Sequence, residues 1–361
     1  SMGGLVREAI DNAMLAANIE WDAIDAVILG KAPDMFEGVV MPELYLADAI
    51  GAVGKPVLRV HTAGSVGGST GVIAATHVCS GQFKTVLTVT FEKQSESNAT
   101  WALSPRYPYS PHINAGAGGY FAPFIREYIR RYDAPEHIGW KVAVKDRLNA
   151  LKNPLAHLHI PGIDEKMVSD TPMLWEPLRY LESCPSSDGA CAMVITSKDL
   201  VGSRDVAWIK GMAVRSEGTL SAGRDEVNPQ AGIDCAKDIY DQAGITNPYK
   251  EIDCAEIYVP FSWYEPMWLE NLGFCDLGEG WKLTDKDATA IDGEMPFNMS
   301  GGVMSSNPIG ASGMIRFGEA ALQVMGKAND HQVEDAKVAM GHAYGGAAQF
   351  FAMWIVSSSL D

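Results

Sequence analysis

The stretch Val57-Leu58-Arg59-Val60 leads after three residues into Gly64-Ser65-Val66-Gly67-Gly68-Ser69-Thr70-Gly71, and this stretch decides the fold. A short apolar run, a glycine-rich turn and the apolar segment 72–78 are typical of a strand that passes through a tight turn into a helix. The second half repeats this order. There, Pro296-Phe297-Asn298-Met299 precedes Gly301-Gly302 and then Pro308-Ile309-Gly310-Ala311-Ser312-Gly313, from which we expect a helix to Met325. Two such units in one chain indicate an internal duplication.

The segments around these turns repeat in the same order. Helix patterns lie at 5–14 and 232–244, and apolar runs lie at 26–30, 85–91, 255–259, 337–340 and 350–356. Apolar strands that alternate with helices favour a buried, largely parallel sheet. We therefore expect an N-terminal half, 1–200, and a C-terminal half, 201–361, of the same α/β design.

The segment from about 95 to 185 does not fit the repeat and is predicted to be an inserted loop domain. It is rich in Pro, His, Tyr and Arg, and we expect it to lie over the sheet edges. Its basic residues differ from the acidic remainder of the chain: Arg126, Arg130, Arg131, Lys141, Lys145, Arg147 and Lys152.

Composition excludes several classes of protein. The chain has 361 residues, 47% of them hydrophobic, and a net charge of −17. This is an ordinary globular composition, and a chain so acidic is a poor binder of nucleic acid or of an anionic membrane. No apolar run approaches the roughly 18 residues of a membrane span. We expect no signal peptide, although the opening Ser1-Met2-Gly3-Gly4 leaves a truncated start open.

The six cysteines are widely spaced and contain neither a C-x-x-C pair nor zinc-ligand spacing. They are Cys79, Cys184, Cys191, Cys235, Cys254 and Cys275. Scattered reduced thiols predict a cytoplasmic protein without a metal site.

The two glycine-rich turns place helix N-termini near the centre of the expected fold. Free N–H groups and partial positive charge at a helix N-terminus suit an oxyanion. The alternative is that the glycines only permit close packing of strand and helix. Neither turn matches a P-loop or G-x-G-x-x-G well, so a nucleotide site is not favoured.

At these residues the chain resembles the thiolase superfamily, in particular the branch of sterol-carrier-protein thiolases and non-specific lipid-transfer proteins. The motifs that carry the resemblance are 65–70, Ser186-Ser187-Asp188-Gly189-Ala190, Glu256-Ile257-Tyr258-Val259-Pro260-Phe261, 298–302, 307–313 and His342-Ala343-Tyr344-Gly345-Gly346. The resemblance covers nearly the whole chain and is greatest to bacterial lipid-transfer proteins of sterol side-chain breakdown. It implies duplicated βαβαβαββ halves in a five-layer α-β-α-β-α fold.

The chain departs from the family at each catalytic position. Ser65 stands where the family has its nucleophilic cysteine, and Asn307 stands where it has the histidine that helps to bind the thioester oxygen. Tyr258 replaces the Asn or His of a third motif, and His342 replaces the second cysteine, which is the acid/base. Tyr344 follows where a small residue is usual.

Each of these residues has a functional and a structural interpretation. Ser65 is either a nucleophile or a support for the turn, and Asn307 is either a donor to the thioester oxygen or a loop residue. Tyr258 is either a proton donor or a core tyrosine. His342 is either the general base or a structural histidine, with Tyr344 sharing the proton relay.

The loss of the cysteine makes thiolysis through an acyl-enzyme unfavourable. An oxyanion site with an acid/base pair suits retro-aldol cleavage of a 3-hydroxyacyl-CoA, and the resemblance implies a steroid-derived substrate. The alternatives are an acetyl-CoA acetyltransferase or thiolase-type acyltransferase with an atypical nucleophile, and a non-catalytic thiolase-like lipid-binding subunit.

The resemblance also implies partners. We expect a homodimer and a small partner subunit with an OB-fold and a zinc ribbon. No cofactor is implied beyond the CoA thioester as substrate. Among the basic residues of the insertion, Lys145 and Arg147 are the candidates for binding CoA.

Overall fold

The computed structural model describes residues 1–32, 36–98, 103, 116–218 and 223–360. Within the expected insertion, residues 99–102 and 104–115 lie outside this description.

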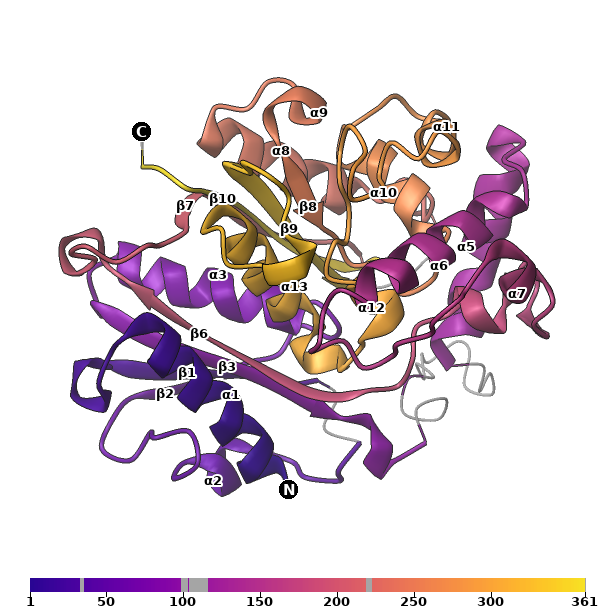
Figure 1. Ribbon diagram of the computed structural model, residues 1–361. Helices are drawn as coiled ribbons and strands as arrows, with labels where there is room; N and C mark the ends of the chain where they lie inside the picture. The colour runs from indigo at the N-terminus through magenta and orange to yellow at the C-terminus, as the bar shows by residue number, and fades with distance from the viewer. Residues whose placement is uncertain (33–35, 99–102, 104–115, 219–222, 361) are drawn as a thin grey trace.

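The first sheet contains four strands in the order β2-β1-β3-β6 (Figure 1). These are β1 (Ala26–Gly30), β2 (Val57–Val60), β3 (Thr85–Lys93) and β6 (Asp188–Thr196). Strand β1 pairs in parallel with β2 and β3, and β6 pairs antiparallel with β3. Strand β1 is completely buried, as its unbroken apolar sequence predicts.

The second sheet has the order β7-β10-β9-β8. Its strands are β7 (Trp208–Ser216), β8 (Cys254–Glu256), β9 (Val338–Gly345) and β10 (Phe350–Ser357). Strand β8 is parallel to β9, and β10 is antiparallel to both β9 and β7. Strands β1, β3 and β6 of the first sheet therefore correspond to β8, β9 and β10 of the second.

Two aspartates occupy equivalent positions in the two halves and make equivalent hydrogen bonds. Asp25 precedes β1 and its carboxylate accepts the backbone N–H groups of Lys84 and Thr85 at 2.7 and 2.9 Å. Asp253 precedes β8 and its carboxylate accepts the N–H groups that open β9 at 2.7 and 2.8 Å. The halves differ at one edge: β7 covers β10, whereas no strand among the described residues covers β6.

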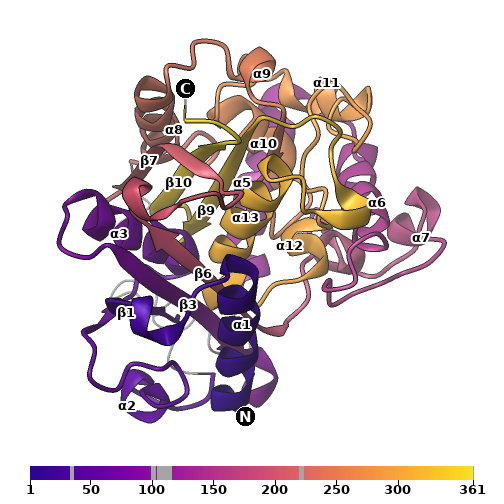
Figure 2. The same cartoon turned by 60° about the vertical axis from the view of Figure 1, so that its left-hand side comes forward.

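Helices complete a five-layer arrangement, seen from two directions in Figures 1 and 2. Helix α1 (Met2–Ala17) packs on the outer face of the first sheet, and α8 (Gln230–Ala243) packs on the outer face of the second. Helices α3 (Val66–Cys79) and α13 (Ile309–Val324) lie between the sheets and contact both. The predicted duplicated, five-layer α/β fold is therefore confirmed.

The two central helices approach each other at glycines. A methyl group on Gly67 of α3 would lie 3.0 Å from the backbone nitrogen of Gly313 and 2.4 Å from that of Met314. Real Cβ atoms do not come so close to backbone, so this contact requires the absence of a side chain. The glycines of the two turns thus serve close packing as well as helix initiation.

The insertion contains α5 (Gly116–Tyr132), α6 (His137–Ala150), α7 (Glu165–Ser169) and the two-stranded pair β4 (Met173–Trp175) and β5 (Leu178–Arg179). The remaining helices are short: α2 (Glu43–Leu46), α9 (Pro248–Glu251), α10 (Tyr264–Asn271), α11 (Gly280–Asp285) and α12 (Gly302–Ser305), with 3-10 turns at Trp21–Ala23, Gln94–Glu96, Tyr180–Glu182, Lys198–Leu200 and Asn329–His331.

A buried ion pair joins α13 to the end of β8. The Arg316 guanidinium bonds to the Glu256 carboxylate and, at 2.8 Å, to the Ser300 hydroxyl. Arg316 and Glu256 are at most 1% exposed. Removal of either partner would leave a buried charge uncompensated.

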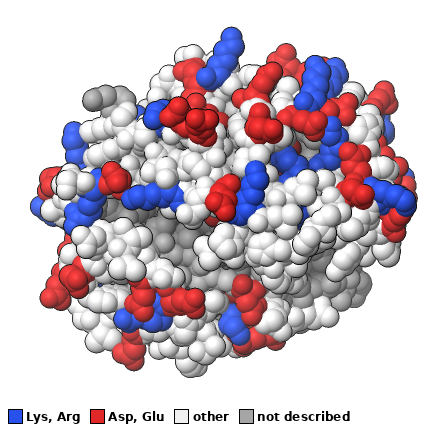
Figure 3. Space-filling model, viewed as in Figure 1, with Lys and Arg blue, Asp and Glu red and all other residues white. Residues whose placement is uncertain are grey.

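Acidic and basic side chains lie in mixed groups on the face drawn in Figure 3, with broad uncharged areas between them. No helix within the described ranges is long and apolar enough to cross a membrane.

Candidate active site

Four of the predicted site residues meet where the central strands and helices end. Tyr258 follows β8, His342 and Tyr344 lie in β9, and Asn307 lies just before α13. The Tyr258 hydroxyl donates to Asn307 Oδ1 at 3.1 Å, and the Tyr258 N–H donates to His342 Nδ1 at 3.2 Å. The rings of Tyr258 and Tyr344 lie 5.3 Å apart, edge to face.

Asn307 is fixed from several sides. Its Oδ1 accepts from both Tyr258 and the Ser312 hydroxyl, the latter at 2.8 Å. Two hydroxyl donors define which amide atom is the oxygen, so the NH₂ group points the other way. One of its hydrogens bonds to Cys184 Sγ at 3.1 Å, and no partner for the second hydrogen is found among the described residues. The backbone N–H bonds to Ser187 Oγ at 3.0 Å.

His342 is completely buried and its state follows from its contacts. Because Nδ1 accepts the Tyr258 N–H, the ring proton is on Nε2, which has no hydrogen-bond partner among the described residues. Burial lowers the pKa of His342 to about 3. At neutral pH the ring is therefore neutral, and its basic nitrogen is already occupied. This geometry favours a positioning role over the predicted role as general base.

Of the two predicted site tyrosines, Tyr258 bonds to Asn307 through its hydroxyl, whereas Tyr344 does not. It is 2% exposed, and its ring stacks on Tyr264 with a centroid distance of 5.6 Å. The two hydroxyls are neighbours, and neither makes a hydrogen bond of normal geometry within the described chain. Burial raises the pKa of both phenols well above the ordinary value, so both hold their protons at neutral pH.

Ser65 lies at the start of α3 but its hydroxyl points into its own turn. It donates to the Thr62 carbonyl at 2.7 Å and contacts the Thr62 hydroxyl at 3.0 Å. Its backbone nitrogen lies against Gly345, where an added methyl group would be 2.5 Å away. The hydrogen bond to a carbonyl gives Ser65 no base, so this arrangement favours the supporting role.

Lys145 and Arg147, the residues expected to bind CoA, both make contacts within the protein. Arg147 is 1% exposed and donates to the backbone carbonyls of Met304, Leu181 and Ser183 at 2.7–3.1 Å. Lys145 lines a surface cavity of about 300 Å³, but its ammonium group is held by two carboxylates. These belong to Glu265, at 2.5 Å, and Asp146, at 3.0 Å. Both cations are therefore engaged within the protein.

A functional group that sequence reasoning missed is the thiol of Cys184. It is half-buried and next to Asn307, and its charge would act on both Tyr258 and Tyr344. Burial raises its pKa to about 11. The signal in the sequence was its position two residues before the motif 186–190, in which the Ser187 hydroxyl accepts the Asn307 N–H.

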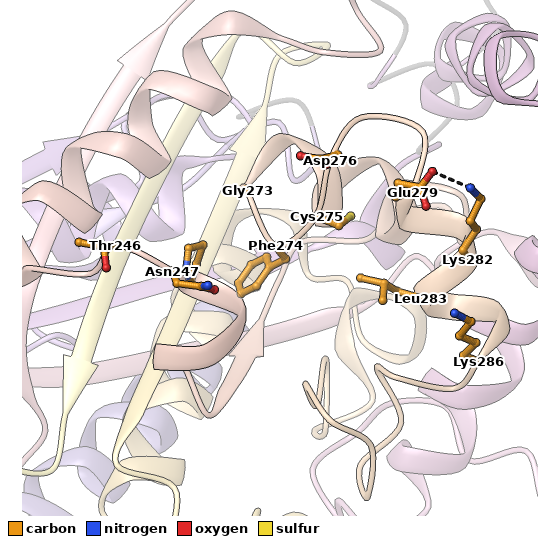
Figure 4. A pocket seen from close by; sticks show the side chains of 11 residues that line it. Thr246, Asn247, Gly273, Phe274, Cys275, Asp276, Glu279, Lys282, Leu283 and Lys286 are labelled. Carbon is orange, nitrogen blue, oxygen red and sulfur yellow. Dashed lines mark hydrogen bonds and ion pairs between the residues drawn. The ribbon is translucent and has the colours of Figure 1, made fainter.

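A further surface cavity of about 620 Å³ lies among the loops near α11 and is drawn in Figure 4. Lys282 and Glu279 at its rim pair with each other at 2.5 Å. The site residues are not among its lining residues. Within the described ranges, no group of three His, Cys, Asp or Glu residues could hold a metal ion.

Comparison with known proteins agrees with this fold. A family model described as thiolase C-terminal domain-like matches residues 213–358. The acetyl-CoA acetyltransferase of Methanothermobacter thermautotrophicus is 28% identical, and the match covers 99% of this chain and 94% of that protein. Human sterol carrier protein 2 is 27% identical over 94% of this chain and 65% of its own length, so this chain spans just under two thirds of that protein.

A solved structure described as Ltp2-ChsH2(DUF35) aldolase has a TM-score of 0.84 at 27% identity, covering 99% of this chain and 93% of that one. The fold is therefore thiolase-like, and residues 213–358 match the thiolase C-terminal domain-like family model. The relatives are those that the sequence motifs predict. Sterol carrier protein 2, a non-specific lipid-transfer protein-like protein and the aldolase structure are thus among the proteins to which nearly the whole chain is similar.

Proposed function

We propose that the chain is an acyl-CoA aldolase, a carbon–carbon lyase that cleaves a bulky, steroid-derived 3-hydroxyacyl-CoA by a retro-aldol reaction. The observation that carries the proposal is the site itself. Asn307, Tyr258 and Tyr344 form a polar cluster, while the Ser65 hydroxyl is bonded to Thr62. Among the described residues, the site thus offers donors and phenols but no activated oxygen nucleophile. The aldolase named for the related structure supports this reaction class.

The reaction needs an acceptor for charge on the thioester oxygen. When the bond between C2 and C3 breaks, the electron pair moves into the thioester and forms an enolate. The second amide hydrogen of Asn307 is the donor that this oxygen would meet, and a preorganised donor in a buried site stabilises the developing charge strongly. No bond between substrate and protein is required.

The reaction also needs a group to take the proton of the 3-hydroxyl. The Tyr344 hydroxyl lies beside the Tyr264 hydroxyl and makes no hydrogen bond of normal geometry among the described residues. The charge of the Glu226 carboxylate in turn raises the pKa of the Tyr264 phenol. We assign proton removal to Tyr344, with Tyr264 and Glu226 receiving the proton behind it. His342 then orients the Tyr258 backbone through Nδ1.

The test is incubation of the purified protein with 3-hydroxyacyl steroid CoA esters, with and without a small partner subunit, while release of the aldehyde or ketone is measured. Release by wild-type protein and its loss in Tyr344→Phe support the aldolase. If Tyr344→Phe and Asn307→Ala leave the activity of the assembled complex unchanged, the chain is a non-catalytic lipid-binding subunit.

A second candidate function, thiolase-type acyl transfer, is favoured by one observation. Cys184 places a thiol 3.1 Å from Asn307 Nδ2, where a thioester would bind. Acyl transfer predicts an acyl group on this sulfur and free CoA. Mass spectrometry after incubation with acyl-CoA separates this from the aldolase, which forms no acyl-enzyme.

The proposal includes a homodimer and a small OB-fold/zinc-ribbon partner. Strand β2 is an edge of its sheet and exposes Leu58. The neighbouring helix α2 exposes Leu44 and Tyr45 to about 70%. Exposed apolar side chains beside an open strand edge suit pairing with a second copy. The two components named for the related aldolase support a partner subunit, and light scattering with and without that partner tests both.

A further inference from the structure

We propose that Cys184 is a catalytic residue, the acid that delivers a proton to the thioester enolate. This inference rests on the proposed retro-aldol function and extends it to a residue outside the family's usual catalytic motifs.

Cys184 lies where the thioester would bind. Its Sγ accepts an amide hydrogen of Asn307 at 3.1 Å, and its backbone N–H donates to the Pro260 carbonyl at 2.9 Å. This second bond ties Cys184 to the segment that carries Tyr258. The sulfur lone pair is used by Asn307, so the S–H hydrogen points elsewhere. The residue is half-buried, whereas Asn307, Tyr258 and Tyr344 are at most 5% exposed.

An independent observation marks the same place as a ligand site. The Tyr344 hydroxyl is nine-tenths buried or more and makes no normal hydrogen bond within the described chain. A charge on the Cys184 sulfur acts on Tyr344 and on Tyr258, so both phenols lie near it. The neighbouring Tyr264 hydroxyl does not supply a hydrogen bond of normal geometry, so this buried phenol would gain a better partner when a ligand binds. The substrate hydroxyl and carbonyl are the polar groups that would provide this partner.

The groups at this site differ in the protons that they hold. His342 has a pKa of about 3 because of burial, so it carries no extra proton at neutral pH. Burial raises the pKa of Tyr258 and Tyr344 above the ordinary value, so both phenols keep their protons at neutral pH. The Cys184 thiol has a pKa of about 11, so it is also protonated at neutral pH, and its sulfur lies beside the amide that is proposed to bind the thioester oxygen. The same pKa leaves very little thiolate, which disfavours attack on the thioester.

The proton balance closes without a further reactant. The 3-hydroxyl loses its proton to Tyr344 and the carboxylate behind it, and the C2–C3 bond breaks to a carbonyl product and an enolate. Cys184 S–H gives its proton to the enolate carbon and becomes a thiolate. The proton held behind Tyr344 then returns to the sulfur, and the enzyme is restored.

The experiment uses the reverse of this step. A group that protonates the enolate also removes a proton from the α-carbon of the product thioester, so the full-length protein should exchange the methyl hydrogens of acetyl-CoA in D₂O. Mass spectrometry of acetyl-CoA measures the rate. We expect exchange by wild type and a loss of at least about 100-fold in Cys184→Ala, within the usual range for one acid–base group.

Two further variants test whether Cys184 acts as a proton donor or only positions Asn307. Cys184→Ser keeps an acceptor for Asn307 but is a far weaker acid, so it should not restore exchange. Restoration by Cys184→Ser would show a positioning role and overturn the proposal. Cys191→Ser, in β6 opposite Thr90, is the matched control and should exchange like wild type. Calorimetric acetyl-CoA affinity and the melting temperature should change little in Cys184→Ser.

The outcomes separate this inference from the proposed function. Undiminished exchange in Cys184→Ala, or no exchange by a wild type that cleaves 3-hydroxyacyl-CoA, overturns the role of Cys184 alone. Exchange that depends on Cys184 in a protein that cleaves no 3-hydroxyacyl-CoA refutes the aldolase and leaves Cys184 as an enolate acid. An acyl group on Cys184 with release of CoA overturns both in favour of acyl transfer.

Discussion

Replacement of Asn307 by alanine should separate catalysis from stability at this site. The amide supplies the donor proposed for the thioester oxygen, and removal of one such donor costs about 100- to 1,000-fold in kcat, or about 3–4 kcal/mol of transition-state stabilisation. Because the charge on the oxygen develops during bond breaking, KM should change little.

The same change removes an acceptor from two buried hydroxyls. Tyr258 and Ser312, at 5% and 0% exposure, both donate to Asn307 Oδ1. An unsatisfied buried hydroxyl costs about 1–3 kcal/mol, so the free energy of unfolding of Asn307→Ala should fall by an amount of this size for each hydroxyl.

The assay measures kcat and KM for cleavage of a 3-hydroxyacyl-CoA at a temperature where urea unfolding shows both proteins to be folded. Ser312→Ala is the matched control, because it removes one donor to the same oxygen and leaves the amide hydrogens in place. We expect its kcat to stay within about threefold of wild type. The reasoning is refuted if Asn307→Ala keeps kcat within threefold, or if its whole loss is in KM.

Three further changes test other parts of the structure. Ser65→Ala should keep cleavage activity within about threefold and form no acyl ester; loss of activity with full folding would return Ser65 to a nucleophilic role. Arg316→Met leaves Glu256 buried without its cation, and urea unfolding should show a loss of about 3–5 kcal/mol that Glu256→Gln in the same chain largely restores; a loss under 1 kcal/mol would contradict the buried pair. His342 has a folded pKa of about 3 against 6.5 unfolded, so the unfolded state binds more protons between these values and stability falls as the pH drops below 6.5. From pH 6.5 to 4.5 this loss is about 2 kcal/mol, and His342→Gln should abolish that part of the pH dependence.

The duplication could be predicted because each half shows the same short sequence patterns in the same order. Each half carries an apolar run, a glycine turn and a helix, and these features depend on neighbours in sequence. Even the equivalent aspartates before β1 and β8 occupy matching positions in the repeat. The positions of Asn307, Tyr258, His342 and Tyr344 followed from their motifs, and the structure brings these four side chains together.

The chemical state of those residues could not be predicted, because it depends on burial. The basic residues of the insertion suggested a phosphate site, yet Arg147 is buried among carbonyl groups. Histidine suggested a base, yet His342 is completely buried and accepts a backbone N–H. The place of Cys184 in the site could not be predicted, because its contact with Asn307 joins residues 123 positions apart. Only the folding of the insertion back onto the second half creates that contact.

The glycine crossing of α3 and α13 links the positions of two predicted site residues. Ser65 lies at the start of α3 and Asn307 lies just before α13, so the separation of the helices sets the distance between these two residues. With no side chain at Gly67 or Gly313, the helices are as close as their backbones allow. A methyl group at Gly67 would push the helices apart, and would thereby shift Ser65 relative to Asn307 although neither residue is changed.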